Sequence, residues 1–148
     1  MNKFKSNNNI VFDCKYHVIW CPKYRRKVLI GDVEKRLKEI LIDVALDTRC
    51  EIIEMETDVN HIHILVSVDP QFGIMKFIKR AKGRSSNLLR KEFKHLRTKL
   101  PTLWTNSTLV SSVGSVSLEV VKKYIENQQT SQRPNAKQKW EDYLKDVN

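Results

Sequence analysis

The chain has 148 residues, a length that fits one domain with a sizeable hydrophobic core. Its apolar content of 41% is typical of a globular protein, and no apolar run approaches the ~18–20 residues of a membrane span. The polar N-terminus carries no secretory signal, and three cysteines are too few for a disulfide framework, so we expect a cytoplasmic protein. We expect a single domain over residues 1–148, with residues 1–9 as a disordered tail.

The net charge of +10 is concentrated in one segment of the chain. Between residues 76 and 99 ten residues are basic and only Glu92 is acidic, so this segment contributes nine of the ten net charges. A solvated helix face usually mixes both signs of charge, so the pattern favours a polyanionic partner such as nucleic acid. A second basic segment, residues 22–27, fits either a nucleic-acid contact or a solvated turn. The candidate nucleic-acid-binding residues from the two segments are Arg25, Lys79, Lys82 and Arg84.

Hydrophobic periodicity predicts eight elements. Asp32 is placed to cap the first helix, and Ile53 and Met55 are expected on the core face of the second strand. The basic residues of the helix over residues 71–93 lie off its expected buried stripe, which is Ile74, Ile78, Ala81, Ser85, Leu88 and Leu89. The order β-α-β-β-α-β followed by two helices is that of the ferredoxin-like split βαβ fold, an α+β class with two helices on one face of the sheet. The elements are strand 10–21, helix 32–48, strand 51–57, strand 61–68, helix 71–93, strand 107–113, helix 118–130 and helix 135–145.

The strand over residues 61–68 has two different faces, because side chains alternate along a strand. Ile62, Ile64, Val66 and Val68 form an apolar stripe that should pack against helices. His61 and His63 lie on the opposite face, where two imidazoles could bind one metal ion or one phosphate. Two ordinary solvated or hydrogen-bonded histidines fit this pattern as well.

A metal site needs a third ligand from elsewhere in the chain. Cys14, His17 and Cys21 share one predicted strand but not one face: Cys14 lies on the expected core face and His17 on the expected open face, so they cannot converge on zinc. Gln128 is a candidate through its amide oxygen, and Tyr124 would then lie one helical turn from the metal. A phenol is a poor nucleophile unaided, but a phosphodiester held on a metal ion is a better electrophile. The alternative for Tyr124 is a tyrosine that only packs against the core.

These residues carry a resemblance to a known family. His61-Ile62-His63 is a His-hydrophobic-His (HUH) motif, and with the other motifs it resembles the TnpA-type single-tyrosine HUH transposases of small bacterial insertion sequences, the IS200-like family. The resemblance runs from about residue 10 to residue 130, with the motifs in the family's order. The other motifs are residues 16–26 (YHVIWCPKYRR), 82–86 (KGRSS), 104–107 (WTNS), 111–114 (SSVG) and 124–128 (YIENQ).

The resemblance implies a fold and a mechanism. It implies a split βαβ core, a homodimer, and Mg²⁺ or Mn²⁺ held by His61, His63 and Gln128, with Tyr124 as the nucleophile. The family cleaves single-stranded DNA beside hairpins and leaves a 5′-phosphotyrosine and a free 3′-OH. In many members the tyrosine helix pairs with the HUH site of the other subunit. Many members also have Asp before the HUH motif, where this chain has Asn60.

Two further interpretations stay open at this point. One is a non-catalytic ferredoxin-like module that binds single-stranded nucleic acid, although the strands lack the aromatic residues typical of such modules. The other keeps the HUH chemistry in a domesticated relative or a replication initiator. Because two imidazoles and a carboxamide form a neutral ligand set, we expect weak metal binding until a DNA phosphate joins.

Overall fold

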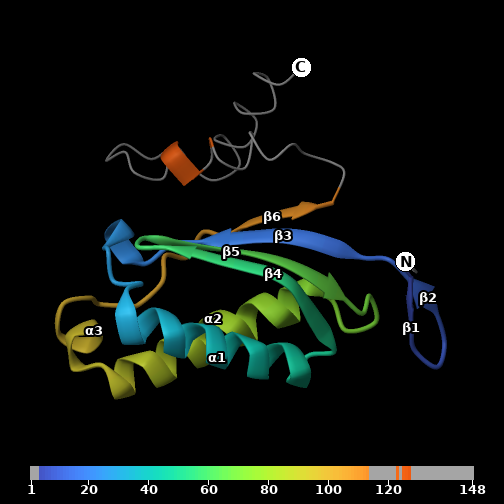
Figure 1. The fold of residues 1–148 in the computed structure, drawn as a ribbon, viewed down its shortest axis with the longest axis horizontal. Helices are drawn as coiled ribbons and strands as arrows, with labels where there is room; N and C mark the ends of the chain where they lie inside the picture. The colour runs from blue at the N-terminus through green and yellow to red at the C-terminus, as the bar shows by residue number, and fades with distance from the viewer. Residues whose placement is uncertain (1–3, 114–122, 124, 128–148) are drawn as a thin grey trace.

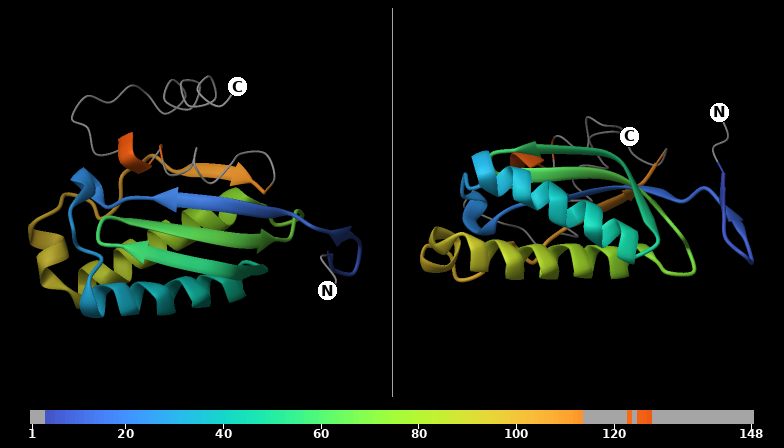
Figure 2. Two further views of the ribbon diagram at one scale, coloured as in Figure 1. Left: turned by 45° about the horizontal axis from the view of Figure 1, so that its top comes forward. Right: turned by 60° about the horizontal axis from the view of Figure 1, so that its bottom comes forward.

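The computed structural model describes residues 4–113, 123 and 125–127. It is built around a four-stranded antiparallel sheet in the order β4-β5-β3-β6. Helices α1 and α2 lie side by side on one face of this sheet (Figures 1 and 2). The chain order β3-α1-β4-β5-α2-β6 confirms the predicted ferredoxin-like α+β plan. The bounds are β3 Lys15–Trp20, α1 Gly31–Asp47, β4 Cys50–Asp58, β5 His61–Val68, α2 Ile74–Glu92 and β6 Leu109–Ser112.

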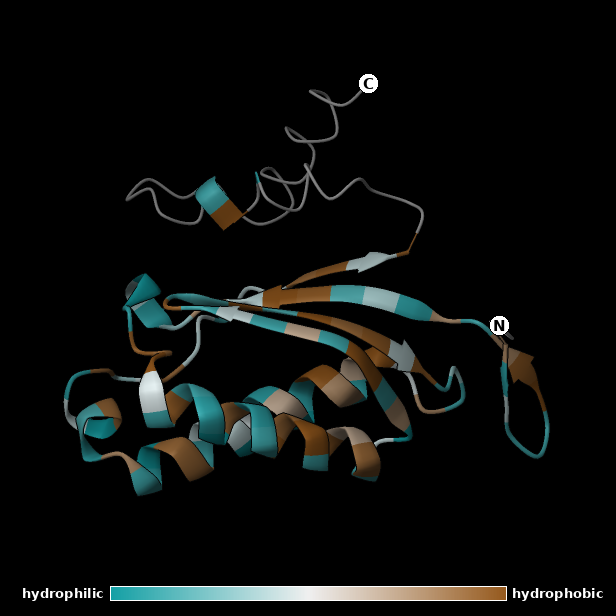
Figure 3. Ribbon diagram, viewed as in Figure 1, coloured by the Kyte–Doolittle hydropathy of each residue, from teal (hydrophilic) through white to brown (hydrophobic). Residues whose placement is uncertain are grey.

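The core lies between the sheet and the two helices. The apolar stripe predicted for β5 is confirmed, since its four members are at most 1% exposed. Hydrophilic and apolar stretches alternate along the helices (Figure 3), as the helical period requires for elements with one buried side. Most of the predicted stripe of α2 is buried too, namely Ile78, Ala81, Ser85 and Leu89. Phe77, which the periodicity did not select, is also buried. The fold is therefore fixed by one continuous apolar layer, which leaves the opposite face of the sheet for other purposes.

A β-bulge changes the predicted face of Ile53 in β4. The pairing of β4 with β5 shifts register between Ile52 and Glu54, so Ile53 is the extra residue. Ile52 and Met55 pack against the core, whereas Ile53 is 42% exposed. The prediction was right for Met55 and wrong for Ile53, because the bulge interrupts the alternation on which it rested.

The start of α1 also differs from the prediction. The helix begins at Gly31 and its N-cap position is occupied by Ile30, with no side-chain cap. Asp32 lies instead within the first turn, together with Glu34, where a carboxylate interacts favourably with the helix dipole. The acidic residue is therefore at the helix N-terminus as expected, but it does not cap it.

Residues 4–12 form a small hairpin where a disordered tail over residues 1–9 was expected. Strand β1 (Lys5–Ser6) pairs antiparallel with β2 (Val11–Phe12). Asn7 holds the connecting turn, since its Oδ1 accepts the backbone N–H groups two and three residues later at 2.8 and 2.9 Å. The asparagine-rich composition thus specifies a turn.

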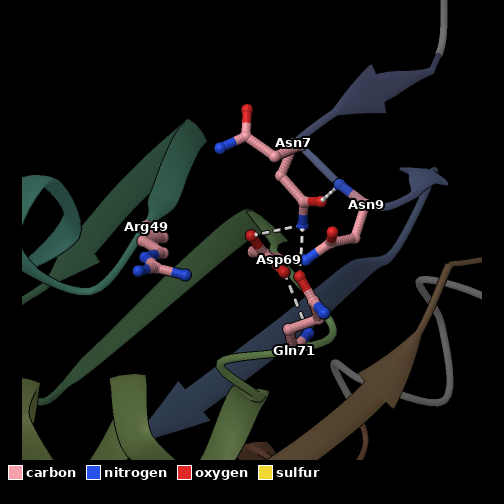
Figure 4. Close-up of a pocket in the computed structure, with 6 residues that line it drawn as sticks. Asn7, Asn9, Arg49, Asp69 and Gln71 are labelled. Atoms are coloured by element: carbon pink, nitrogen blue, oxygen red, sulfur yellow. Dashed lines mark hydrogen bonds between the residues drawn. The ribbon is translucent and has the colours of Figure 1, made fainter.

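The same asparagine ties the hairpin to the turn between β5 and α2. Asn7 Nδ2 donates to Asp69 Oδ2 and to Gln71 Oε1, each at 2.9 Å (Figure 4). These residues line a cavity of about 350 Å³ together with Asn9 and Arg49. Hydrogen bonding from Asn7 lowers the pKa of the Asp69 carboxyl. The N-terminal hairpin is therefore a docked element of the domain.

Two of the motif segments meet where β3 and β6 approach each other. Pro22 and Trp104 form a bridge, and the backbone N–H of Thr105 donates to Cys21 O at 3.0 Å. Trp104 Nε1 donates to the buried hydroxyl of Ser85 at 2.9 Å, which links this loop to α2. A short helix that the sequence pattern did not predict, α3 (Lys94–Thr98), precedes the loop.

The helices predicted over residues 118–130 and 135–145 lie largely outside the described residues. Lys123 and residues 125–127 are described and helical. Figure 1 shows residues 125–127 on the face of the sheet opposite α1 and α2. Among the described residues no helix is long and apolar enough to cross a membrane.

Candidate functional site: histidines on the open face of the sheet

The two HUH histidines lie on the face of β5 that points away from the helices. Their neighbours Ile62 and Ile64 are 0% exposed in the core, while His61 and His63 are half-buried on the opposite side. This arrangement follows directly from strand alternation and confirms that the two imidazoles share a face. We call this side of the sheet the histidine face.

A third histidine, from β3, contacts the pair. His17 Nδ1 lies 2.9 Å from His63 Nε2, and the two ring centroids are 5.1 Å apart. His17 is paired with Leu65 in the β3–β5 register, so it is a diagonal neighbour of His63. The sequence placed His17 on the open side of its strand but gave it no partner.

Asn60 contacts the other HUH histidine. Its Oδ1 lies 3.1 Å from His61 Nδ1. A carbonyl oxygen can only accept, so His61 Nδ1 carries the proton and Nε2 keeps its lone pair. A hydrogen bond of this kind fixes the tautomer of many metal-binding histidines. The amide of Asn60 can therefore perform this role without an acid at the position.

Carboxylates on the neighbouring strand border the histidine face. Glu56 is paired with His63 and Asp58 with His61 in the β4–β5 register, and Glu54 stands opposite Leu65. All three acids are exposed. They place negative charge beside the imidazoles, as a site for a cation requires.

The environment keeps both HUH imidazoles neutral at neutral pH. Burial is the main cause that lowers the pKa of His61; Asp58 opposes it and Arg25 adds to it. Burial also lowers the pKa of His63, and His17 lowers it further, against the opposing effect of Glu56 and Glu54. A neutral imidazole has one unprotonated nitrogen, whose lone pair a metal ion can use once no other contact occupies it.

These donors fit a divalent ion in part. They supply two neutral imidazoles on one face, and oxygen ligands are nearby on β4. Within residues 4–113, 123 and 125–127, however, no three His, Cys, Asp or Glu side chains converge on one point. The predicted third ligand Gln128 and the predicted nucleophile Tyr124 lie outside the described residues. The described residues 125–127 lie on the same side of the sheet as the histidine face (Figure 1).

Comparison with known proteins identifies the family. The sequence profile described as "Transposase IS200 like" matches residues 10–128. The chain belongs to the IS200-like transposases. It is 38% identical over 128 residues to the ISDra2 transposase TnpA of Deinococcus radiodurans, which covers 85% of this chain and 91% of the relative. It is 30% identical to the transposase for insertion sequence element IS200 of Salmonella typhimurium, over 86% of this chain and 85% of the relative.

Solved structures agree with this assignment. A crystal structure of a candidate transposase from Deinococcus radiodurans R1 is similar, with a TM-score of 0.78 and 33% identity over 86% of this chain and 99% of that one. The structure of a REP-associated tyrosine transposase bound to a REP hairpin has a TM-score of 0.51 and 14% identity. It covers 83% of this chain and 67% of its own, and it shares the fold.

Two of the four basic residues selected from the sequence, Lys82 and Arg84 on α2, contact other parts of the transposase. Lys82 Nζ donates to Thr105 O at 2.7 Å and to Thr108 Oγ1 at 2.9 Å. Arg84 forms an ion pair with Asp47 of α1 at 2.7 Å. These side chains hold α2 against the rest of the domain, so a role in DNA binding would come in addition to a structural one.

Arg25 and Lys79 have different surroundings. Arg25 follows Tyr24 in the short 3-10 helix η1 (Lys23–Arg25), and both residues have left-handed backbone, with φ of 49° and 58°. Arg25 is only 8% exposed and donates to the carbonyl of Ile125, so it links η1 to the described residues 125–127. Lys79 is exposed on α2, on the opposite side of the sheet. The four candidates therefore do not form one surface.

Sequence reasoning missed His17, Asn60 and Arg25 as neighbours of the HUH pair. The alternation of side chains placed His17 on the correct face of its strand. The sequence does not reveal the register between β3 and β5, which brings His17 beside His63. That register depends on contacts between residues 46 positions apart.

Proposed function

We propose that this transposase cleaves and rejoins single-stranded DNA at hairpin-marked ends through a covalent phosphotyrosine, with Tyr124 as the nucleophile. The observation that supports this most strongly is the pair of neutral imidazoles, His61 and His63, on the face of the sheet opposite the helices, in a chain of this family. The described residues that follow β6 return to the same face, next to Arg25.

In the proposed reaction, the Tyr124 oxygen forms a bond to the scissile phosphorus and the bond to the 3′ oxygen breaks. The products are a 5′-phosphotyrosine and a strand that ends in a free 3′-OH. Attack by another 3′-OH on the phosphotyrosine reverses these bond changes, so a strand is resealed without ATP. The ester stores the bond energy, because one phosphodiester is exchanged for another.

His61, His63 and Gln128 are the proposed ligands of Mg²⁺ or Mn²⁺. When bound, the ion would polarise a phosphoryl oxygen and offset negative charge in the transition state. Asn60 holds His61 in the tautomer that leaves Nε2 available. The lowered pKa values of both histidines keep protons from competing for the site at neutral pH.

The proposed DNA contacts divide between two sides of the domain. The scissile phosphate would lie on the histidine face, near Arg25. The exposed basic residues of α2, with Lys79 among them, lie on the other side of the sheet, where they can bind phosphates away from the point of cleavage. A REP-associated tyrosine transposase with this fold is bound to a hairpin in its structure, which supports hairpin DNA as the substrate here.

The alternative is a module that binds single-stranded nucleic acid without cutting it. Such modules stack bases on aromatic side chains of the open sheet face. The corresponding positions of β3 and β5, the central strands of the described sheet, carry Lys15, His17 and Ile19, and His61, His63, Leu65 and Ser67. None of these is Phe, Tyr or Trp, so this face suits metal-assisted chemistry better than stacking.

Covalent trapping tests the proposal. The full chain is incubated with labelled single-stranded hairpin oligonucleotides and Mn²⁺, and the products are separated on a denaturing gel. We expect an adduct that persists in denaturant and is absent in Tyr124→Phe, because only the hydroxyl is removed. Tyr16→Phe is the matched control, since Tyr16 packs against the hydrophobic core on the helix side of the sheet and should leave the adduct unchanged. Binding without an adduct, across a range of hairpin sequences, would favour the module.

The homodimer is part of the same proposal and has a test of its own. His63→Ala and Tyr124→Phe are each expected to be inactive. If the tyrosine of one subunit serves the histidines of the other, a mixture of the two variants restores part of the adduct. If each subunit is self-contained, the mixture remains inactive, and size-exclusion chromatography with light scattering then reports the oligomeric state separately.

A further inference from the structure

We propose that His17 is a positioning residue of this site: it holds His63 turned away from His61, and the metal site assembles when His63 exchanges His17 for the ion. The inference rests on the proposed function, because it concerns how the metal would reach the HUH pair. It depends on three features of the His17–His63 contact.

The first feature is that the contact is end-on. The nitrogen atoms are 2.9 Å apart and the ring centroids 5.1 Å apart, a difference of about 2.2 Å. That difference is close to the sum of two ring radii, so the line between the nitrogens runs nearly through both ring centres. If two imidazoles had their nitrogens this close because they shared one metal ion, at a bond length of ~2.0–2.1 Å, the rings would meet at roughly a right angle and their centroids would be closer. The geometry is that of a hydrogen bond between the rings.

The second feature is the direction in which His63 points. Nδ1 lies close to the backbone of its own residue, so the contacted atom of His17 is near the position of Leu65 in the sheet. His63 extends its Nε2 toward that position. His61 lies in the opposite direction along β5. His63 therefore presents its outer nitrogen away from its HUH partner.

The third feature is that neither proton arrangement leaves His63 Nε2 free. If His17 Nδ1 donates, it uses the lone pair of His63 Nε2; if His63 Nε2 donates, that nitrogen carries a proton. In both cases the outer nitrogen of His63 is unavailable to an ion. His61 Nε2, by contrast, keeps its lone pair because Asn60 contacts the other nitrogen.

The two HUH histidines therefore have unequal roles. His61 is ready to bind, and His63 must first leave His17. In the free protein, metal binding must break the His17–His63 hydrogen bond, which costs about 1 kcal/mol net. Additional ligands of the ion, such as a DNA phosphate, would offset this cost, so the ion should occupy the site mainly when they are present.

The test measures Mn²⁺ affinity of the full chain without DNA, from the electron paramagnetic resonance signal of free Mn²⁺. His17→Phe keeps a flat ring and removes the nitrogen, so we expect about fivefold tighter binding, the loss of one net hydrogen bond. His17→Asn keeps a polar group near the position of Nδ1 and should stay close to wild type. His61→Ala should abolish binding, which shows that the signal reports this site. Circular dichroism verifies that each variant folds.

A second readout examines the contact before any metal is added. In ¹⁵N-labelled protein the imidazole nitrogen shifts of His63 should change in His17→Phe and remain near wild type in His17→Asn. His17→Ala provides an independent deletion in case the phenyl ring disturbs the sheet.

The outcomes separate this inference from the proposed function. Unchanged affinity in both His17→Phe and His17→Ala overturns the inference and leaves the metal site intact. Weaker binding in both overturns it as well, because His17 would then be a ligand or a support. If wild type and the His17 variants all fail to bind Mn²⁺ both without DNA and with a single-stranded hairpin oligonucleotide present, the metal-dependent function and the inference both fail.

Discussion

The two faces of the sheet are held together in different ways. On the helix face, the apolar residues of β5 pack against α1 and α2 and are at most 1% exposed. On the histidine face, the same strand supplies half-buried imidazoles whose partners come from β3, β4 and the loop before β5. The helix face is held by area removed from water, whereas the site on the histidine face depends on individual hydrogen bonds.

This difference predicts different consequences of mutation for adjacent residues. Burial of apolar area is shared among many contacts, so its loss weakens the whole fold. A polar site depends on a few atoms in defined positions, so its loss removes chemistry and leaves the fold intact. Residues 63 and 64 are neighbours in sequence and lie on opposite faces, which makes them a direct comparison.

His63→Ala should have the largest effect, and only on the reaction. A bound divalent ion contributes several kcal/mol of transition-state stabilisation, so we expect adduct formation to fall by about 10³-fold. The thermal unfolding midpoint should change much less than in a core truncation, because His63 is only half-buried and lies outside the hydrophobic core cluster. Single-turnover cleavage and a thermal melt of the same sample measure the two effects. A large loss of stability would show that the histidine face is also needed for folding.

Ile64→Ala should have the opposite profile. The side chain is 0% exposed, and its truncation should lower the free energy of unfolding by about 3 kcal/mol through lost burial and a cavity. Urea denaturation measures this loss. The cleavage rate per folded molecule should remain within about twofold of wild type, since Ile64 faces away from the site. A rate that falls as far as in His63→Ala would contradict the separation of the two faces.

The helix face could be predicted from the sequence because its signal is periodic. The alternation in β5 and the helical repeat of α2 each identified most of their buried residues. Ile53 was misplaced because a bulge inserts one residue into β4, and nothing in the composition of that strand marks the insertion. The N-terminal hairpin was missed because a polar, asparagine-rich segment can form a docked turn as well as a tail.

For the histidine face, the alternation of side chains along a strand predicted which residues share the face but not which of them contact each other. It placed His61 and His63 together, and the family motif gave them a function. The contact with His17 depends on strand register, and the tautomer of His61 depends on a side chain that the family resemblance left in doubt. Lys82 was selected as a DNA contact because it lies off the apolar stripe of α2, yet its ammonium reaches residues 105 and 108. Helical position alone does not reveal where a long side chain ends.

Lys82 tests whether the helix side of the sheet tolerates a charged group. Its ammonium is partly buried at the edge of the hydrophobic core. Burial lowers the pKa of Lys82 to about 8, while an unfolded lysine has a pKa of ~10.4. Below pH 8 both states are protonated and the cost of burying the charge is constant. Between pH 8 and pH ~10.4 the folded state loses its proton while the unfolded state retains it, so stability should rise with pH.

We expect this rise to be about 1 kcal/mol, less than the full pKa difference implies, because part of the ammonium is exposed to solvent. Lys82→Met fills a similar volume without a titrating group, so the difference in unfolding free energy between wild type and variant isolates this residue from the others that titrate in the range. Urea denaturation at pH 7.5, 8.5 and 9.5 measures it. If the difference stays constant with pH, the hydrogen bonds to Thr105 and Thr108 offset the cost of burying the charge. A polar group on the helix side would then depend on individual hydrogen bonds, as the histidine site does.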